Sequence, residues 1–211
     1  MSEDFTGLHV LADDGPRWRL GPVEQALAAC EGGAAVVQLR VKYGTDREAL
    51  RWGETIREAT RRAGARFVMN DRFDLALLLE ADAVHVGQED LPPGRVRVLA
   101  GEKLAIGRST HDDAELARAL SEPVDYVAFG PVFGTSSKQT PHPACGLERL
   151  AAAAARVRSC PLVAIGGIDL DTIALVIAAG ARGVAVLSAV AGAADPALAT
   201  RRLVQALEAS A

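Results

Sequence analysis

Short apolar segments alternate with longer amphipathic segments along the whole chain. The apolar segments are rich in β-branched residues, which is typical of buried strands, whereas the longer segments repeat their apolar positions with helical spacing. The expected strands cover residues 8–12, 34–39, 66–69, 83–86, 103–107, 125–129, 161–165 and 183–187. The expected helices cover residues 22–31, 46–63, 73–80, 93–100, 111–120, 147–157 and 170–179, with a last helix opening at Asp195-Pro196.

Eight strand–helix units of about 25 residues each are near the lower size limit of one α/β architecture, the (β/α)8 TIM barrel. A doubly wound sheet also alternates strands and helices, but it usually has fewer strands. We therefore expect a single (β/α)8 barrel in which residues 1–211 form one domain. Function should lie in the segments that follow each strand, because the carboxyl ends of all strands open on one face.

Two carboxylates follow neighbouring strands. Asp71, in the segment Asn70-Asp71-Arg72, follows the third strand, and Asp90 follows the fourth strand, which Gly87 closes. A sparse pair of oxygen ligands suits Mg²⁺, which keeps several waters and completes its shell with substrate phosphates. The alternative is that Asp71 caps the next helix and that Asp90 belongs to an ordinary turn before Pro92.

Polar side chains also alternate after the second strand. Gln38, Arg40 and Lys42 point to the same side of an extended segment, which here would be the mouth of the barrel. An Arg fork and a Lys point charge in a row make a plausible clamp for pyrophosphate. The alternative is a surface ion pair with the acidic helix that follows.

The segments after the fifth and sixth strands carry hydroxyl and cationic groups. Residues 107–111 are expected to open a helix, where Ser109 or Thr110 either contacts a ligand or caps the helix, and where His111 acts as a base or is satisfied by local backbone. Residues 130–146 form the longest segment without a regular pattern, and such long loops tend to be functional. Its hydroxyls and Lys138 could wrap a phosphate, although a flexible linker has a similar Gly and Ser content.

Backbone groups dominate after the last two strands. Gly166-Gly167 follows the seventh strand and Leu187-Ser188 follows the eighth. Barrels commonly hold a phosphate on backbone N–H groups at these two positions. The sequence thus combines two carboxylates for one Mg²⁺, a cationic clamp beside them and a separate phosphate site opposite. This combination predicts a barrel that binds two phosphorylated ligands and displaces pyrophosphate with the help of a metal.

Composition narrows the choice of partners. The chain has 211 residues, a formal net charge of −4 and 4% aromatic residues, so it has neither the basic surplus nor the stacking residues that nucleic-acid binding requires. The acidic start of the chain has no long apolar run, which predicts neither a signal peptide nor a membrane span and favours the cytoplasm. Three widely spaced cysteines indicate reduced thiols and argue against a zinc site.

Taken together, these motifs resemble the thiamine phosphate synthase family over nearly the whole chain. The resemblance rests on seven segments in the family's order, namely residues 38–42, 70–72, 85–92, 107–111, 135–138, 165–168 and 187–189. It implies the coupling of 4-amino-5-hydroxymethyl-2-methylpyrimidine diphosphate (the pyrimidine diphosphate) with 4-methyl-5-(2-hydroxyethyl)thiazole phosphate (the thiazole phosphate). The products would be thiamine phosphate and pyrophosphate.

The resemblance also implies roles for individual residues. Asp71 and Asp90 would be Mg²⁺ ligands. The pyrimidine diphosphate would contact Gln38, Arg40, Lys42, Asn70, Ser109 and Lys138. The thiazole phosphate would contact Thr135, Ser137, Gly167, Leu187 and Ser188. Family members usually have threonine where this chain has Ser137, and serine keeps the hydroxyl.

The chemistry implied by the resemblance is dissociative. Mg²⁺ and the Arg40, Lys42 and Lys138 side chains would take up charge on the departing pyrophosphate, and the thiazole nitrogen would attack the resulting pyrimidinylmethyl cation. The catalytic residues that the resemblance implies are Arg40, Lys42, Ser109 and Lys138.

Two other functions compete with the synthase. A sister family on the same barrel, the thiazole tautomerase, would use a histidine where His111 lies, but it typically loses the aspartate of the Asn-Asp-Arg motif and the Gln-Glu-Asp segment. A non-catalytic barrel that binds phosphorylated metabolites would not need two metal-binding carboxylates beside a cationic clamp. Because Asp71, Asp90, Arg40 and Lys42 are all present, the synthase is favoured. Barrels of this size often associate, so a homo-oligomer is possible.

Overall fold

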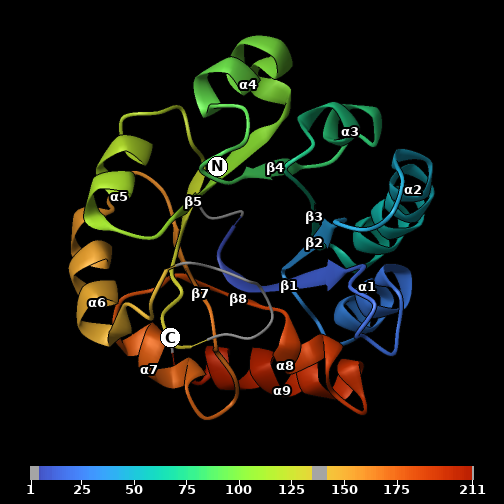
Figure 1. Ribbon diagram of the computed structural model, residues 1–211. Coiled ribbons are helices and arrows are strands. Elements are labelled where there is room, and N and C mark those ends of the chain that lie inside the picture. The colour runs from blue at the N-terminus through green and yellow to red at the C-terminus, as the bar shows by residue number, and fades with distance from the viewer. Residues whose placement is uncertain (1–4, 135–141, 211) are drawn as a thin grey trace.

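Eight parallel strands close into a barrel, and helices surround it on the outside (Figure 1). The structure is a computed structural model, which describes residues 5–134 and 142–210. The strands are β1 (Gly7–Asp13), β2 (Val36–Arg40), β3 (Arg66–Asn70), β4 (Ala83–Val86), β5 (Ala105–Thr110), β6 (Tyr126–Phe129), β7 (Leu162–Ile165) and β8 (Gly183–Val186). The helices are α1 (Pro22–Glu31), α2 (Asp46–Ala63), α3 (Phe73–Leu78), α4 (Pro93–Ala100), η1 (Gly101–Lys103), α5 (Asp113–Ala119), α6 (Gly146–Arg156), α7 (Ile173–Ala178), α8 (Ser188–Ala191) and α9 (Pro196–Glu208).

Each strand pairs with the next strand in the chain, and β8 pairs with β1 to close the ring. The closing register sets Gly7 beside Gly183, and the register of the first pair sets His9 beside Val36. The (β/α)8 barrel predicted from the alternation of strand and helix patterns is therefore confirmed.

Two apolar cores support the barrel. The larger core lies between the strands and the surrounding helices, and the smaller core fills the inside of the barrel. Inside, the Tyr126 ring stacks on Phe5 with centroids 4.9 Å apart. Gly107 makes room for this ring, because a Cβ atom there would lie 2.1 Å from its Cζ atom. Side chains thus fill the interior of the barrel, so we expect ligands to bind at the end where the strands have their carboxyl ends.

Local capping fixes several helix ends. Thr45 and Glu48 form a reciprocal capping box at the start of α2, and Gly64 ends that helix in a left-handed conformation. Asp112 caps α5 and Asp195 caps α9, each through its side-chain oxygen.

The fifth strand is longer than predicted. It runs to Thr110, so residues 109 and 110 belong to a strand and do not cap the next helix, which Asp112 caps instead. Polar side chains hid this extension: Arg108 is buried, and the Thr110 hydroxyl donates to the Ala128 carbonyl at 2.9 Å. The short helix α8 was also missed, because four residues carry no helical periodicity.

Among the residues that the structure describes, none of the helices is long and apolar enough to cross a membrane.

Candidate active site

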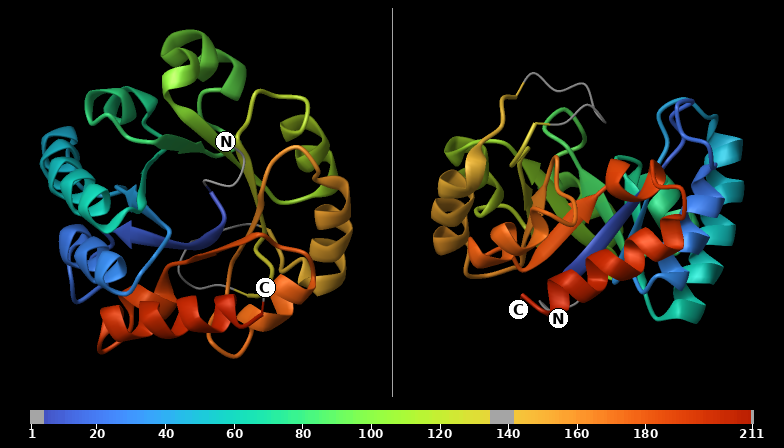
Figure 2. Two further views of the ribbon diagram at one scale, coloured as in Figure 1. Left: turned by 180° about the vertical axis from the view of Figure 1, so that it is seen from behind. Right: turned by 90° about the horizontal axis from the view of Figure 1, so that it is seen from below.

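The carboxyl ends of the strands meet at one edge of the barrel, which we call the mouth. The right-hand view of Figure 2 shows the loop after β1, in blue, rising at this edge on one side. The segments on either side of residues 135–141, in yellow and orange, rise on the other side. Residues that are far apart in sequence therefore face a shared space.

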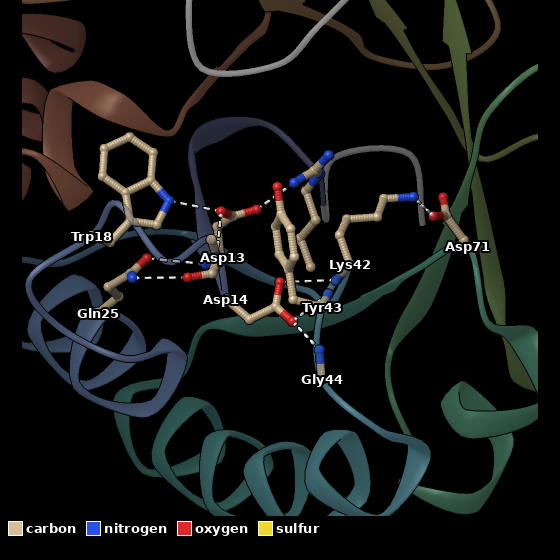
Figure 3. Close-up of polar contacts among 10 residues, drawn as sticks. Asp13, Asp14, Trp18, Gln25, Lys42, Tyr43, Gly44 and Asp71 are labelled. Atoms are coloured by element: carbon tan, nitrogen blue, oxygen red, sulfur yellow. Dashed lines mark hydrogen bonds and ion pairs between the residues drawn. The ribbon is translucent and has the colours of Figure 1, made fainter.

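The two cations at the end of β2, Arg40 and Lys42, are each held by a carboxylate at the end of a neighbouring strand. The Arg40 guanidinium forms an ion pair with Asp13 at the end of β1. The Lys42 Nζ atom lies 2.5 Å from the Asp71 Oδ2 atom (Figure 3). The predicted alternative, a surface ion pair of these cations with α2, is wrong, because their partners are Asp13 and Asp71 and not residues of α2.

Asp71 and Asp90 lie side by side, and their pKa values move in opposite directions. Burial acts to raise the pKa of Asp71, but hydrogen bonds with Lys42 and Asp90 and the Lys42 charge lower it below its usual range. Burial raises the pKa of Asp90, the Gly87 N–H opposes the rise, and the neighbouring Asp71 adds to it. Two partly buried carboxylates in contact favour a shared positive charge between them.

The local alternatives for these aspartates have different outcomes. Within the described residues α3 has no side-chain cap, so Asp71 does not cap it; its φ of 62° instead is one that L-residues seldom adopt. Asp90 does close a local turn, because its Oδ2 atom accepts from the Gly87 N–H at 2.6 Å.

The side chains predicted to contact the pyrimidine lie on neighbouring strands. Gln38 is buried inside the barrel and hydrogen-bonds Tyr126, while Asn70 ends β3 and is half-buried. Ser109 lies on β5, where its Oγ atom is 2.8 Å from His85 Nε2.

His85 connects Ser109 to Tyr126, a role that sequence reasoning missed. Its Nδ1 atom lies 3.0 Å from the Tyr126 hydroxyl, so one chain of hydrogen bonds connects Ser109, His85 and Tyr126. The sequence offers one signal for this, a histidine in the middle of a strand whose other residues are apolar. A buried polar side chain needs partners, and inside a barrel they come from the facing strands.

A cavity of about 100 Å³ opens on the other side of the mouth. Its lining comes mainly from the ends of β5, β6, β7 and β8, including Ser109, Gly167, Leu187 and Ser188, and is completed by Leu11 of β1 and Arg40 of β2. Gly166 and Gly167 both have positive φ values, and a Cβ atom on Gly167 would lie 2.5 Å from the Gly134 carbonyl oxygen. Only glycine fits this backbone, which leaves main-chain groups exposed to the cavity.

Comparisons with known proteins agree with this arrangement. The family model described as thiamine monophosphate synthase matches residues 8–190. The thiamine-phosphate synthase of Moorella thermoacetica is 48% identical over 181 residues, which cover 86% of each chain. The thiamine-phosphate synthase of Chlorobium phaeovibrioides is 45% identical over 189 residues, which cover 90% of each chain.

The chain belongs to the thiamine monophosphate synthase family.

Solved structures support the same family. The thiamine phosphate pyrophosphorylase from Pyrococcus furiosus superposes with a TM-score of 0.90 at 36% identity, over 99% of this chain and 98% of that one. The N-(5'-phosphoribosyl)anthranilate isomerase from the same organism has a TM-score of 0.66 at 15% identity, which shows a shared fold alone. The family predicted from the order of the motifs is confirmed.

Three residues that the resemblance to the thiamine monophosphate synthase family suggested for substrate binding, Thr135, Ser137 and Lys138, lie outside the described residues. The described residues on either side of residues 135–141 form backbone hydrogen bonds at the mouth. The Phe133 N–H donates to the Gly166 carbonyl at 2.9 Å, and the Cys145 N–H donates to the Pro131 carbonyl at 2.8 Å. The ends of the loop are thus fixed next to the glycines that line the cavity.

His111, the residue that the competing tautomerase would use, contacts two other side chains in this member of the thiamine monophosphate synthase family. Its Nδ1 atom lies 2.8 Å from Glu115 Oε2, and its ring stacks on His142 with centroids 4.0 Å apart and an interplanar angle of 7°. These three residues offer donor atoms within 4.8 Å of one another. Because the ring planes are parallel, the nitrogen lone pairs run side by side and do not converge on one ion.

Proposed function

We propose that this chain is a thiamine-phosphate synthase, a transferase that joins the pyrimidine diphosphate to the thiazole phosphate and releases pyrophosphate. The observation that carries the proposal is the combination, in one barrel mouth of a family member, of a carboxylate pair and two cations facing a cavity lined by backbone groups. Such a mouth offers different chemistry to two phosphorylated substrates at once.

In this proposal Asp71 and Asp90 hold Mg²⁺. The donor set fits, since both groups offer hard oxygen ligands, lie in contact, and are partly buried near two side chains that can bind phosphate. When bound, the ion supplies positive charge to phosphate oxygens and so favours the departure of pyrophosphate.

The side chains around this pair bind and orient the diphosphate. Arg40 presents a planar fork and Lys42 a point charge, and Lys138 is proposed to add a third cation. These charges stabilise negative charge on the departing pyrophosphate. Carbon–nitrogen bond formation by a thiazole nitrogen requires no general base, which agrees with a mouth rich in charges and poor in activated nucleophiles.

The uncharged groups select and place the two rings. Gln38, Asn70 and Ser109 are proposed to contact the pyrimidine, and the hydrogen bond from His85 limits the rotation of the Ser109 hydroxyl. The thiazole phosphate is proposed to bind in the cavity, on the backbone of Gly167. The remaining proposed contacts of this phosphate are Leu187, Ser188, Thr135 and Ser137.

We further propose that residues 1–211 act as one domain, which the match of the family model over residues 8–190 supports.

The test is to mix the purified protein with both substrates and Mg²⁺ and to follow thiamine phosphate by its oxidation to fluorescent thiochrome phosphate. We expect product that depends on Mg²⁺, is lost with a chelator, and collapses in an Asp90→Ala variant. Folded wild-type protein that makes no product would contradict the proposal. In that event tautomerase activity would be measured with the wild type and with His111→Ala.

A further inference from the structure

Two consecutive carboxylates at the end of β1, Asp13 and Asp14, hold the cations of the mouth in place. We call Arg40 and Lys42 the cationic clamp. Figure 3 shows Asp13 and Asp14 on one side of Lys42 and Asp71 on the other.

Asp13 fixes the side chain of Arg40. Asp13 as a whole residue is only 3% exposed, and its carboxylate forms the ion pair with the Arg40 guanidinium through Oδ2. Its other oxygen, Oδ1, accepts from Trp18 Nε1 at 2.7 Å and from the Gly15 N–H at 2.9 Å. The buried Gln25 side chain bonds both the N–H and the carbonyl of Asp13, each at 2.9 Å. With every oxygen of Asp13 engaged, its carboxylate has little freedom to rotate.

Asp14 fixes the backbone that carries Lys42. Its carboxylate accepts from three successive N–H groups, those of Lys42, Tyr43 and Gly44, at 2.8, 2.8 and 2.7 Å. Lys42 and Tyr43 are exposed, so packing does little to hold this turn. The position of the Lys42 backbone therefore depends mainly on one carboxylate.

We propose that Asp13 and Asp14 are positioning residues that preorganise the cationic clamp for a diphosphate. Asp13 acts through the Arg40 side chain and Asp14 acts through the Lys42 backbone. A cation that is already held in one geometry loses less freedom when its ligand binds, and a misplaced cation stabilises a departing group poorly. The inference rests on the proposed function for the identity of the diphosphate, and it places neither carboxylate in contact with substrate.

The opposite end of the barrel supplies a matched control. Asp82 also joins an arginine to a strand, since its Oδ2 atom lies 2.9 Å from Arg57 Nη1 and accepts from the Phe67 N–H at 2.7 Å. Its Asn variant removes a comparable ion pair and a comparable anchor, far from the mouth. A purely structural role of Asp13 would make Asp13→Asn and Asp82→Asn behave alike.

The experiment compares Asp13→Asn, Asp14→Asn and Asp82→Asn with the wild type. In Asp13→Asn the amide oxygen can still accept from Trp18 and Gly15, while the amide nitrogen replaces the oxygen that faces Arg40. The KM for each substrate and kcat are measured, and the binding of pyrophosphate with Mg²⁺ is measured separately by titration calorimetry.

We expect KM for the pyrimidine diphosphate and the Kd for pyrophosphate to rise about tenfold in Asp13→Asn, since charged hydrogen bonds are worth that much. Asp14→Asn should show a smaller rise of the same kind. KM for the thiazole phosphate should rise less than KM for the pyrimidine diphosphate in Asp13→Asn, because Arg40 also lines the cavity, and it should change less than about twofold in Asp14→Asn. Asp82→Asn should leave both KM values unchanged.

Unchanged pyrophosphate affinity in folded Asp13→Asn and Asp14→Asn, or equal changes in both KM values, would overturn the inference. Because calorimetry needs no turnover, a wild type that binds pyrophosphate but forms no thiamine phosphate would refute the proposed function alone. If Asp13→Asn does not fold, the Asp14→Asn variant, at a half-exposed residue, still tests the inference.

Discussion

The two halves of the mouth bind anions by different means. The half built from β1 to β4 carries charged side chains, and there Arg40 is paired with Asp13 and Lys42 with Asp71. The half built from β6 to β8 surrounds a cavity with glycine backbone and uncharged side chains, and Arg40 of β2 lines the same cavity. One half therefore depends on charge and the other on main-chain geometry.

The difference shows how one barrel can distinguish two phosphorylated molecules. A diphosphate carries more charge and can share a metal ion, so it should prefer the half with carboxylates and cations. A monophosphate that only needs N–H donors should prefer the backbone half. Four changes would break or sharpen this division.

The largest effect is expected from Asp71→Asn. Loss of one of the two proposed ligand carboxylates should lower kcat/KM by about 100-fold or more, because metal charge stabilisation is worth several kcal/mol. The control is Asp74→Asn, three residues after Asp71, which removes an exposed ion-pair partner of Arg72. Steady-state assays at several Mg²⁺ concentrations should show the loss only in Asp71→Asn. A similar loss in both variants would argue against a metal site.

The next effect concerns His9, a buried residue of β1. Burial lowers the pKa of His9 to about 4, against a hydrogen bond with the Phe5 carbonyl that raises it. The unfolded chain, with its ordinary pKa of 6.5, binds more protons between these values, so the free energy of unfolding falls as the pH falls through this window. At pH 5 this group should cost about 2 kcal/mol of stability relative to pH 7.5.

Urea unfolding of the wild type and of His9→Gln at both pH values measures this cost. The variant should lose about 2 kcal/mol less than the wild type on acidification, while both KM values at pH 7.5 stay unchanged. Equal losses in the two proteins would show that His9 is not held neutral.

A smaller effect is expected from Gly167→Ala. Its Cβ atom would lie 2.5 Å from the Gly134 carbonyl oxygen and would displace backbone that we expect to bind the thiazole phosphate. KM for the thiazole phosphate should rise about tenfold, the effect of losing a charge-assisted hydrogen bond, with KM for the pyrimidine diphosphate unchanged.

Gly64→Ala is the matched control for Gly167→Ala. Gly64 has a φ of 71°, close to the 68° of Gly167, but a Cβ atom there meets nothing within 4 Å. Both variants should lose about 1 kcal/mol of stability from the left-handed backbone. Only Gly167→Ala should change a KM value, and a change in both would attribute the effect to stability.

The smallest effect is that of salt. Raising the ionic strength about tenfold should increase KM for the pyrimidine diphosphate about threefold, because exposed charges are screened beyond about 10 Å at 0.1 M. KM for the thiazole phosphate should respond less, since short contacts to backbone dipoles are screened less. Equal responses would remove the distinction between the two halves.

Much of the fold follows from the sequence, because strands that are buried on both faces are continuous apolar runs. The last turn of β5 does not follow, since Arg108, Ser109 and Thr110 look like a loop until their partners on β4 and β6 are known. Polar residues inside a barrel satisfy one another across strands, and this pairing leaves no local pattern.

Part of the candidate site could be predicted by the same reasoning. Arg40 ends a strand, and Asp71, Lys42 and Asp90 follow strand ends within a few residues, which is enough to place them at the mouth. The contributions of Asp13, Asp14 and His85 could not be predicted, because they depend on which strand lies next to which and on the hydrogen bonds each side chain forms there.

The most direct test of the two-half account is a ³¹P magnetic resonance measurement with Mn²⁺ in place of Mg²⁺. Pyrophosphate and the thiazole phosphate, which do not react with each other, are added together to the protein. The account predicts strong broadening of the pyrophosphate signal by the ion at Asp71 and Asp90, weaker broadening of the monophosphate signal, and no displacement of either ligand by the other. Equal broadening, or competition between the two ligands, would contradict it.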